Sequence, residues 1–138
     1  MYVSVTPNMM VKDMNQTLDF YTSILGFEFV TGVIENSQDT VSMREENQLL
    51  QWAMVTAGNV TLMFQTEKSL TGEIAQFEGT SIGSSSTLFI KVEDVTALYE
   101  ELKDKVAIVK DLEPTFYGTQ EFYFSDCNGY ILGIAGSI

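Results

Sequence analysis

The sequence predicts an α+β fold built from two βαβββ modules, because one strand–helix unit occurs twice along the 138-residue chain. Residues 6–11 and residues 87–92 have strand-like composition, and each segment is followed by an aspartate that suits a helix N-cap. After each expected helix come three further strand-like segments. We therefore expect a first module over about residues 1–66, a connecting loop over residues 67–85 and a second module over about residues 86–138.

The first expected helix begins at Asp13, because Gln16 follows three positions later in a pattern similar to a capping box. The apolar positions that recur at helical spacing are Met14, Leu18, Tyr21 and Leu25. Gly26 follows where a helix commonly ends in a left-handed residue. These signals predict an amphipathic helix between Asp13 and Gly26.

The second expected helix begins at Asp94 and repeats the design of the first. Its apolar stripe is Val95, Leu98, Tyr99 and Leu102. Lys103 and Lys105 follow, where positive charge favours the C-terminal end of a helix dipole. Superposing residue 11 on residue 92 also aligns the two cap residues, Asp13 and Asp94, which supports an internal repeat.

The remaining strand-like segments alternate with turn signals. They are residues 27–34, 51–56 and 60–65 in the first half, and residues 106–109, 119–125 and 130–135 in the second. Gly58-Asn59 and Asn128-Gly129 predict tight turns between strands. Residues 66–86 are rich in Gly, Ser and Thr, so we expect a mobile or ligand-dependent connection, and residues 36–47 form a second long polar excursion.

The composition predicts a folded cytoplasmic protein. The hydrophobic content is 45%, no apolar run approaches the roughly 20 residues that cross a bilayer, and the N-terminus lacks a signal-peptide pattern. Cys127 is the only cysteine, so no internal disulfide forms. The 19 acidic and 7 basic residues give a net charge of −12, which disfavours nucleic acid as a partner. This charge attracts cationic small molecules, or it serves solubility alone.

Two segments resemble the vicinal oxygen chelate superfamily, which includes glyoxalases, extradiol dioxygenases, fosfomycin-resistance enzymes and bleomycin-resistance proteins. They are residues 11–27, within which Leu18-Asp19-Phe20-Tyr21 and Leu25-Gly26-Phe27 match best, and residues 122–130, Phe-Tyr-Phe-Ser-Asp-Cys-Asn-Gly-Tyr. Cys127 stands where the family usually has proline. The resemblance covers nearly the whole chain and implies that the modules form a curved mixed sheet around a cleft. Because this superfamily places many different functions on one scaffold, the resemblance specifies the fold well and the activity poorly.

The same resemblance implies four positions at which metal-dependent members place His, Gln or Glu. In this chain those positions carry Thr6, Thr61, Thr87 and Gly133, and the chain has no histidine at all. A neutral hydroxyl is a poor ligand for a divalent transition metal, and glycine has no side chain. We therefore expect neither a metal nor another cofactor, and we expect the metal-dependent glyoxalase and dioxygenase activities to be absent.

Strand alternation from these four positions predicts which side chains face the cleft. The cleft face would carry Thr6, Asn8, Met10, Thr61, Met63, Gln65, Thr87, Phe89, Lys91, Ile131, Gly133 and Ala135. The opposite parity would pack against the helices through Val5, Leu62, Leu88, Ile90, Leu132 and Ile134. This split is typical of a sheet with one face covered by helices.

Three aromatic or acidic residues add to the predicted ligand site. Tyr123 corresponds to a tyrosine that faces the substrate in fosfomycin-resistance relatives, and alternation places Glu121 beside it. A carboxylate near an aromatic ring suits an amine or a planar cation, although ordinary strand packing of Tyr123 and a solvated edge position for Glu121 explain the pattern equally well. Trp52 suits stacking on a flat ligand, or a core or dimer-interface role. The loop at residues 116–118 is placed to close over the cleft.

These expectations lead to a metal-independent small-molecule-binding protein. By resemblance to the bleomycin-resistance branch, we expect a homodimer that sequesters a planar or cationic compound, as antibiotic-resistance proteins do. The predicted ligand-binding residues are Thr6, Asn8, Trp52, Thr61, Met63, Thr87, Phe89, Glu121, Tyr123 and Gly133. The alternatives are an enzyme, with acid–base catalysis by Glu121 and Tyr123 or an atypical metal site, and a structural or regulatory domain without turnover. No conventional nucleophile–base pair can form without histidine.

Overall fold

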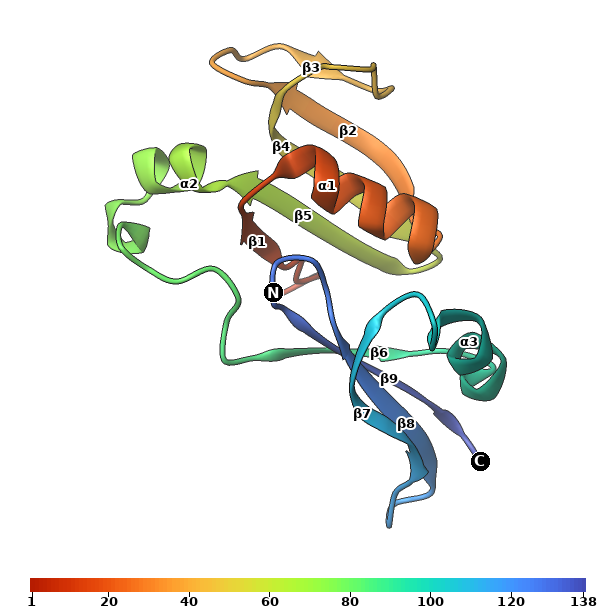
Figure 1. Ribbon diagram of the computed structural model, residues 1–138. Helices are drawn as coiled ribbons and strands as arrows, with labels where there is room; N and C mark the ends of the chain where they lie inside the picture. The colour runs from red at the N-terminus through yellow and green to blue at the C-terminus, as the bar shows by residue number, and fades with distance from the viewer. The chain divides into compact units, whose positions relative to one another are not determined.

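Two mixed β-sheets, one in each half of the chain, define the architecture (Figure 1). The computed structural model describes all residues 1–138 and divides them into two units, Met1–Ser81 and Ile82–Ile138. Each unit contains a sheet whose first strand runs parallel to its neighbour, while the remaining pairs are antiparallel. The predicted α+β class and the strand–helix repeat are therefore confirmed. No helix is long and apolar enough to cross a membrane.

The first unit has a five-stranded sheet in the order β1-β5-β4-β2-β3. Its elements are β1 (Asn8–Val11), α1 (Met14–Asp19), a π-helical turn (Phe20–Ile24), β2 (Glu28–Ile34), β3 (Thr40–Val41), β4 (Leu50–Ala57), β5 (Val60–Thr66), α2 (Glu67–Glu73) and a 3-10 turn (Ala75–Phe77). This is the predicted βαβββ order with the two-residue strand β3 and the helix α2 added.

The signals at both ends of the first helical segment, which consists of α1 and the π-helical turn after it, act as the sequence predicts. The Asp13 carboxylate accepts a hydrogen bond from the backbone N–H of Gln16 at 3.0 Å. Gly26 has φ +79°, a conformation that costs glycine little, and the chain turns there into β2. Between these ends Tyr21 is fully buried, and its ring lies 4.7 Å from the ring of Phe64 in β5. The apolar stripe therefore fixes α1 on one face of the sheet.

The second unit has a four-stranded sheet in the order β6-β9-β8-β7. Its elements are β6 (Thr87–Lys91), α3 (Val95–Leu102), β7 (Ala107–Pro114), β8 (Thr119–Ser125) and β9 (Ile131–Ser137). The Asp94 carboxylate caps α3 by accepting from the N–H of Ala97 at 3.0 Å. The ring of Tyr99 on α3 meets the ring of Phe122 at 5.2 Å, so α3 covers the face of the sheet that carries Phe122.

The structure differs from the expected elements in four places. The first strand begins at Asn8, so Val5 is 92% exposed and does not pack against a helix as predicted. The expected connecting loop contains α2, whose N-cap Thr66 accepts a hydrogen bond from the N–H of Ser69. The polar excursion contains β3, and β7 continues to Pro114 instead of ending near residue 109.

Candidate functional site

The open face of the second sheet brings together five of the predicted site residues. The rows of paired residues across β6, β9 and β8 are Thr87–Ile131–Ser125, Phe89–Gly133–Tyr123 and Lys91–Ala135–Glu121. Side chains of one parity share a face, so Thr87, Phe89, Gly133, Tyr123 and Glu121 lie together. The other parity carries Leu132 and Ile134, which are buried on the side of α3.

Tyr123 covers the position at which the family resemblance implied a metal ligand. A Cβ atom added to Gly133 would lie 2.3 Å from Cε2 of the Tyr123 ring and 2.9 Å from its Cζ. The ring therefore occupies the space that any side chain at residue 133 needs. Glycine at this position is explained by the close approach of an aromatic ring, a contact that only a residue without Cβ permits.

Glu121 is a buried carboxylate surrounded by hydroxyl groups. It is 4% exposed. The Tyr117 hydroxyl donates to both carboxylate oxygens at 2.9 and 2.8 Å, the Thr119 hydroxyl donates to Oε2 at 3.0 Å, and the Tyr123 hydroxyl donates to Oε1 at 3.3 Å. No lysine or arginine forms an ion pair with it. The alternative of a solvated edge residue is therefore wrong.

The same carboxylate changes the acidity of its neighbours. The hydrogen bond to Glu121, followed by desolvation, raises the pKa of the Tyr117 hydroxyl above its ordinary value. Burial, followed by the negative charge of Glu121, raises the pKa of Tyr123 in the same direction. Both phenols therefore keep their protons at neutral pH and remain hydrogen-bond donors.

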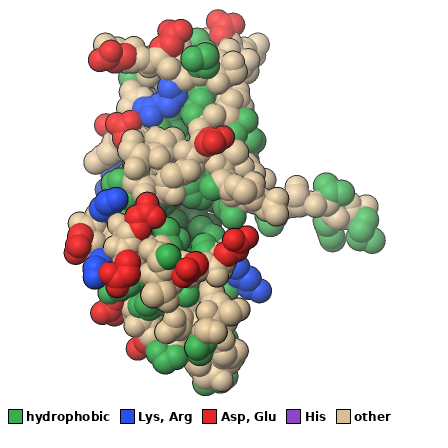
Figure 2. Space-filling view, turned by 90° about the vertical axis from the view of Figure 1, so that its right-hand side faces the viewer, with side chains coloured by type: hydrophobic (Ala, Val, Ile, Leu, Met, Phe, Trp, Pro, Cys, Tyr) green, Lys and Arg blue, Asp and Glu red, His purple; other side chains and the backbone are tan.

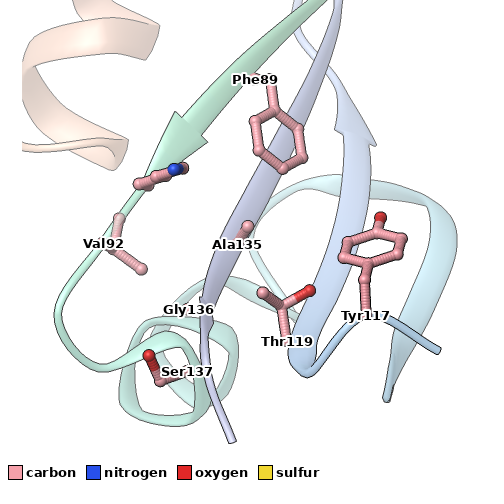
Figure 3. Close-up of a pocket in the computed structure, with 8 residues that line it drawn as sticks. Phe89, Val92, Tyr117, Thr119, Ala135, Gly136 and Ser137 are labelled. Carbon is pink, nitrogen blue, oxygen red and sulfur yellow. The ribbon is translucent and has the colours of Figure 1, made fainter. Parts of the chain in front are cut away.

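A cavity of about 340 Å³ opens beside this cluster, entirely within the second unit. Its walls include Phe89, Lys91, Tyr117, Thr119 and Ala135. Figure 3 shows the Phe89 ring above Ala135 and the Tyr117 ring to its right, with the Thr119 side chain between Ala135 and Tyr117. Two wall residues, Tyr117 and Thr119, are thus also donors to Glu121, which places the carboxylate directly behind the cavity wall.

The open face of the first sheet holds all the other predicted residues except Thr6. The rows across β1, β5 and β4 are Asn8–Met63–Met54 and Met10–Gln65–Trp52, followed on β5 and β4 by Thr61–Thr56. Asn8, Trp52, Thr61 and Met63 therefore share this face. Thr6 precedes β1 and is partly buried, so it does not lie on a strand as expected.

Gln65 connects this face to α2. Its side-chain oxygen accepts from Asn8 Nδ2 at 2.9 Å, and its Nε2 donates to Ser69 Oγ at 3.0 Å and to Glu73 Oε2 at 3.4 Å. It is 5% exposed. A ligand that uses the predicted contact Asn8 must therefore compete with this network.

The side chains at the four implied metal positions do not fit a divalent transition metal. Three are threonines, of which Thr87 is exposed, and the fourth is Gly133 beneath the Tyr123 ring. No three His, Cys, Asp or Glu side chains gather anywhere in the chain in a way that would hold a metal ion. Hydroxyl oxygens alone lack the imidazole, thiolate or carboxylate character that such metals select.

Tyr117 and Thr119 are functional candidates that the predicted site did not contain. Thr119 shares its strand parity with Glu121, so alternation was a signal for it. Tyr117 lies in the turn between β7 and β8, and no periodic pattern shows where a turn residue directs its side chain.

Comparison with known proteins shows the family. The model of the Glyoxalase/Bleomycin resistance protein/Dioxygenase superfamily matches residues 4–134, so the chain belongs to this superfamily. No curated protein sequence matches the chain.

Solved structures share the fold at low sequence identity. A protein of unknown function from Agrobacterium tumefaciens str. C58 is 19% identical, with 100% of this chain and 96% of that chain covered and a TM-score of 0.74. A glyoxalase-related enzyme from Fulvimarina pelagi is 16% identical, with 99% and 89% covered and a TM-score of 0.71. The bleomycin-binding protein from Streptomyces verticillus, complexed with copper(II)-bleomycin, is 17% identical, with 100% and 98% covered and a TM-score of 0.62. The same fold thus occurs in a bleomycin-binding protein and in a glyoxalase-related enzyme, and it does not by itself assign a role to this chain.

Proposed function

We propose that this protein binds and sequesters a planar or cationic small molecule without a metal ion. The observation that carries the proposal is the Tyr123 ring packed over Gly133, because it replaces a metal ligand with an aromatic surface. The solved structure of a bleomycin-binding protein with the same fold supports a binding role.

The cavity in the second unit has the properties of a small-molecule site. Its volume of about 340 Å³ falls at the lower end of the range for ligand pockets, which are lined mainly by apolar and aromatic groups with few polar anchors. Phe89 and Tyr117 offer aromatic surface, and Glu121 lies behind the wall as a negative charge. A net charge of −12 increases the local concentration of a cationic ligand.

An enzyme that uses Glu121 and Tyr123 as an acid–base pair is the second candidate. The hydrogen bond from the Tyr123 hydroxyl to Glu121 Oε1, at 3.3 Å, favours it. The raised pKa of Tyr123 opposes a role as a base near neutral pH, because the phenol stays protonated. Binding without turnover accounts for the same residues and needs no proton transfer.

A homodimer is part of the proposed function. The segment before β1 exposes Met1, Tyr2, Val3 and Val5 almost completely, and this apolar arm projects from the surface in Figure 2. Both sheets also end in edge strands whose outer backbone groups have no strand partner within the chain, namely β1, β3, β6 and β7. A second copy would cover such groups, as closed symmetric assemblies do.

Two measurements on purified protein test the proposal. Elemental analysis should find no stoichiometric Zn, Ni, Fe or Mn. A thermal-shift screen against cationic antibiotics, with glutathione conjugates as an anionic comparison set, should give stabilisation by the cations. A ligand at a hundredfold excess over its dissociation constant adds about 2.7 kcal/mol to the free energy of unfolding.

The result that contradicts the proposal is equally specific. About one metal ion per chain, lost when Thr6, Thr61 and Thr87 are replaced by valine, would show a metal site built from unexpected ligands. Turnover of a glyoxalase or dioxygenase substrate that depends on Glu121 and Tyr123 would favour the second candidate.

A further inference from the structure

We infer that Tyr117 sets the ligand specificity of the second-unit cavity by competing with a cationic ligand for Glu121. In the free protein the Tyr117 hydroxyl donates a hydrogen bond to the Glu121 carboxylate. When the ligand binds, an ammonium group or a protonated ring nitrogen of the ligand replaces this hydroxyl as the donor. This inference rests on the proposed function and names the charge class of the ligand and the residue that selects it.

The Glu121 carboxylate is held by neutral hydroxyl donors. Three neutral hydroxyls satisfy its oxygens, and Tyr117 alone accounts for two of the four contacts. Hydroxyl donors offset part of the desolvation of a buried carboxylate but leave its charge without a counter-ion. A cation that reaches the carboxylate adds a Coulomb attraction that a neutral donor lacks, and the low dielectric of the site strengthens it.

The Tyr117 side chain has room to move, because it lies at the surface. Tyr117 is 55% exposed, and its neighbour Phe116 is 99% exposed. The turn itself is fixed, because the Thr115 N–H donates to the Thr119 carbonyl at 2.8 Å and the hydroxyls of these two threonines are 2.8 Å apart. The Tyr117 side chain can therefore rotate away from Glu121 without any change in the strands, and exposed rotamers exchange rapidly.

The cavity lies next to two of the residues that donate to Glu121. Tyr117 and Thr119 line the cavity and also donate to Glu121, and Phe89 belongs to the same lining (Figure 3). A flat ligand that occupies the cavity therefore has an aromatic surface on one side and the carboxylate within reach once the Tyr117 hydroxyl moves. Lys91 is the one charged side chain of the wall. A ligand held mainly by Lys91 would have to be an anion, not a cation.

A matched set of three acridines separates these cases. At pH 7.5, 9-aminoacridine is a planar cation, acridine is neutral and acridine-9-carboxylate is an anion, and all three are followed by fluorescence. We expect the wild-type protein to bind 9-aminoacridine more tightly than acridine. In Tyr117→Phe the competing hydroxyl is absent and the aromatic surface remains, so the affinity for 9-aminoacridine should rise about tenfold, which is the scale of one hydrogen bond to a charged group.

Two further variants serve as controls. Glu121→Gln should reduce the affinity for 9-aminoacridine to that for acridine. Tyr99→Phe removes another phenol that donates to a carboxylate, that of Asp111, on the helix-covered side of the sheet, and should leave all three affinities unchanged. Circular dichroism and the melting temperature establish that each variant is folded.

Three results would overturn the inference. If Tyr117→Phe binds 9-aminoacridine with unchanged affinity while Glu121→Gln loses binding, Tyr117 does not compete with the ligand. The proposed cation site at Glu121 would then still stand. Preference for acridine-9-carboxylate assigns the cavity to Lys91. Absence of binding of all three acridines to the wild type and to Tyr117→Phe counts against this inference, whereas metal content and the antibiotic screen judge the proposed function separately.

Discussion

Glu121 alters the protonation of the two tyrosines that hold it, and this effect is measurable without a ligand. Replacing Glu121 with glutamine removes the charge and retains the shape. The pKa of Tyr117 should then fall towards the ordinary value of about 10, because its largest cause of elevation is the hydrogen bond to this carboxylate. The pKa of Tyr123 should fall less, because burial is its largest cause. Absorbance at 295 nm during an alkaline titration reports both, and a titration curve identical to wild type would show that the cluster does not form.

The same elevation fixes the sign of a pH effect on stability. Tyr117 and Tyr123 have higher pKa values in the folded than in the unfolded chain. Their contribution is complete below the unfolded value of about 10 and is lost as the pH rises through the folded values. Urea unfolding between pH 8 and pH 11.5 should therefore show a fall above pH 10 that is shallower in Tyr123→Phe. An equal fall in both proteins would contradict the linkage.

Gly133 should tolerate no side chain while Tyr123 is present. Gly133→Ala places a methyl group 2.3 Å from the ring, and relief requires a ring shift that also weakens the bond to Glu121. Overpacking of this kind costs about 1–3 kcal/mol of unfolding free energy. Gly72→Ala is the matched control, because nothing lies within 4 Å of its added Cβ and alanine favours helix. Equal stability of Gly133→Ala and wild type in urea unfolding would show that the ring does not cover residue 133.

At the scale of single elements, the N-cap of α3 allows the contribution of a hydrogen bond to be separated from that of charge. Asp94→Ala removes the acceptor for the Ala97 N–H and should lower the unfolding free energy by about 1 kcal/mol. Asp94→Asn keeps an oxygen acceptor and should restore most of that loss. Denaturant unfolding followed by circular dichroism measures both, and equal stability of the two variants would mean that charge, not the hydrogen bond, provides the effect.

Local signals explain which elements were predictable. The caps at Asp13 and Asp94 and the glycine turns act through neighbouring residues, so the sequence shows them directly. The helix α2 was missed because Gly72 and its Ser and Thr residues indicate a loop. Its stability comes instead from tertiary contacts, namely the buried Leu70 and the bonds from Gln65. Propensity is a weak predictor where such contacts decide the outcome.

The candidate site was predictable up to the same limit. Alternation correctly grouped Phe89, Glu121, Tyr123 and Gly133, because a strand imposes a period of two on its side chains. The burial of Glu121 was not predictable, since it depends on a hydroxyl that Tyr117 supplies from a turn. Thr6 was placed on a strand because residues 6–11 have strand-like composition and the family resemblance implied a ligand position there, whereas pairing begins at Asn8.

At the scale of the whole molecule, the exposed arm predicts association. Light scattering at micromolar concentration should give twice the 15.4 kDa mass of one chain. Replacing Tyr2, Val3 and Val5 with serine should shift the equilibrium towards monomer, because the apolar area that a partner covers is smaller. Replacing the exposed Val30 with serine is a control for general loss of surface hydrophobicity, because β2 already has a strand partner on each side. A monomer mass for the wild type would rule out the dimer.

The packing of Tyr123 over Gly133 also restricts how this chain can change during evolution. A mutation that places glutamate at residue 133 meets the ring and destabilises the fold, while one that shortens Tyr123 exposes an unfilled groove above glycine. Each step is harmful alone, and the two become acceptable only together. The two positions are therefore energetically coupled, and laboratory selection for a metal-ligating side chain at residue 133 should recover changes at 123 and 133 jointly or not at all.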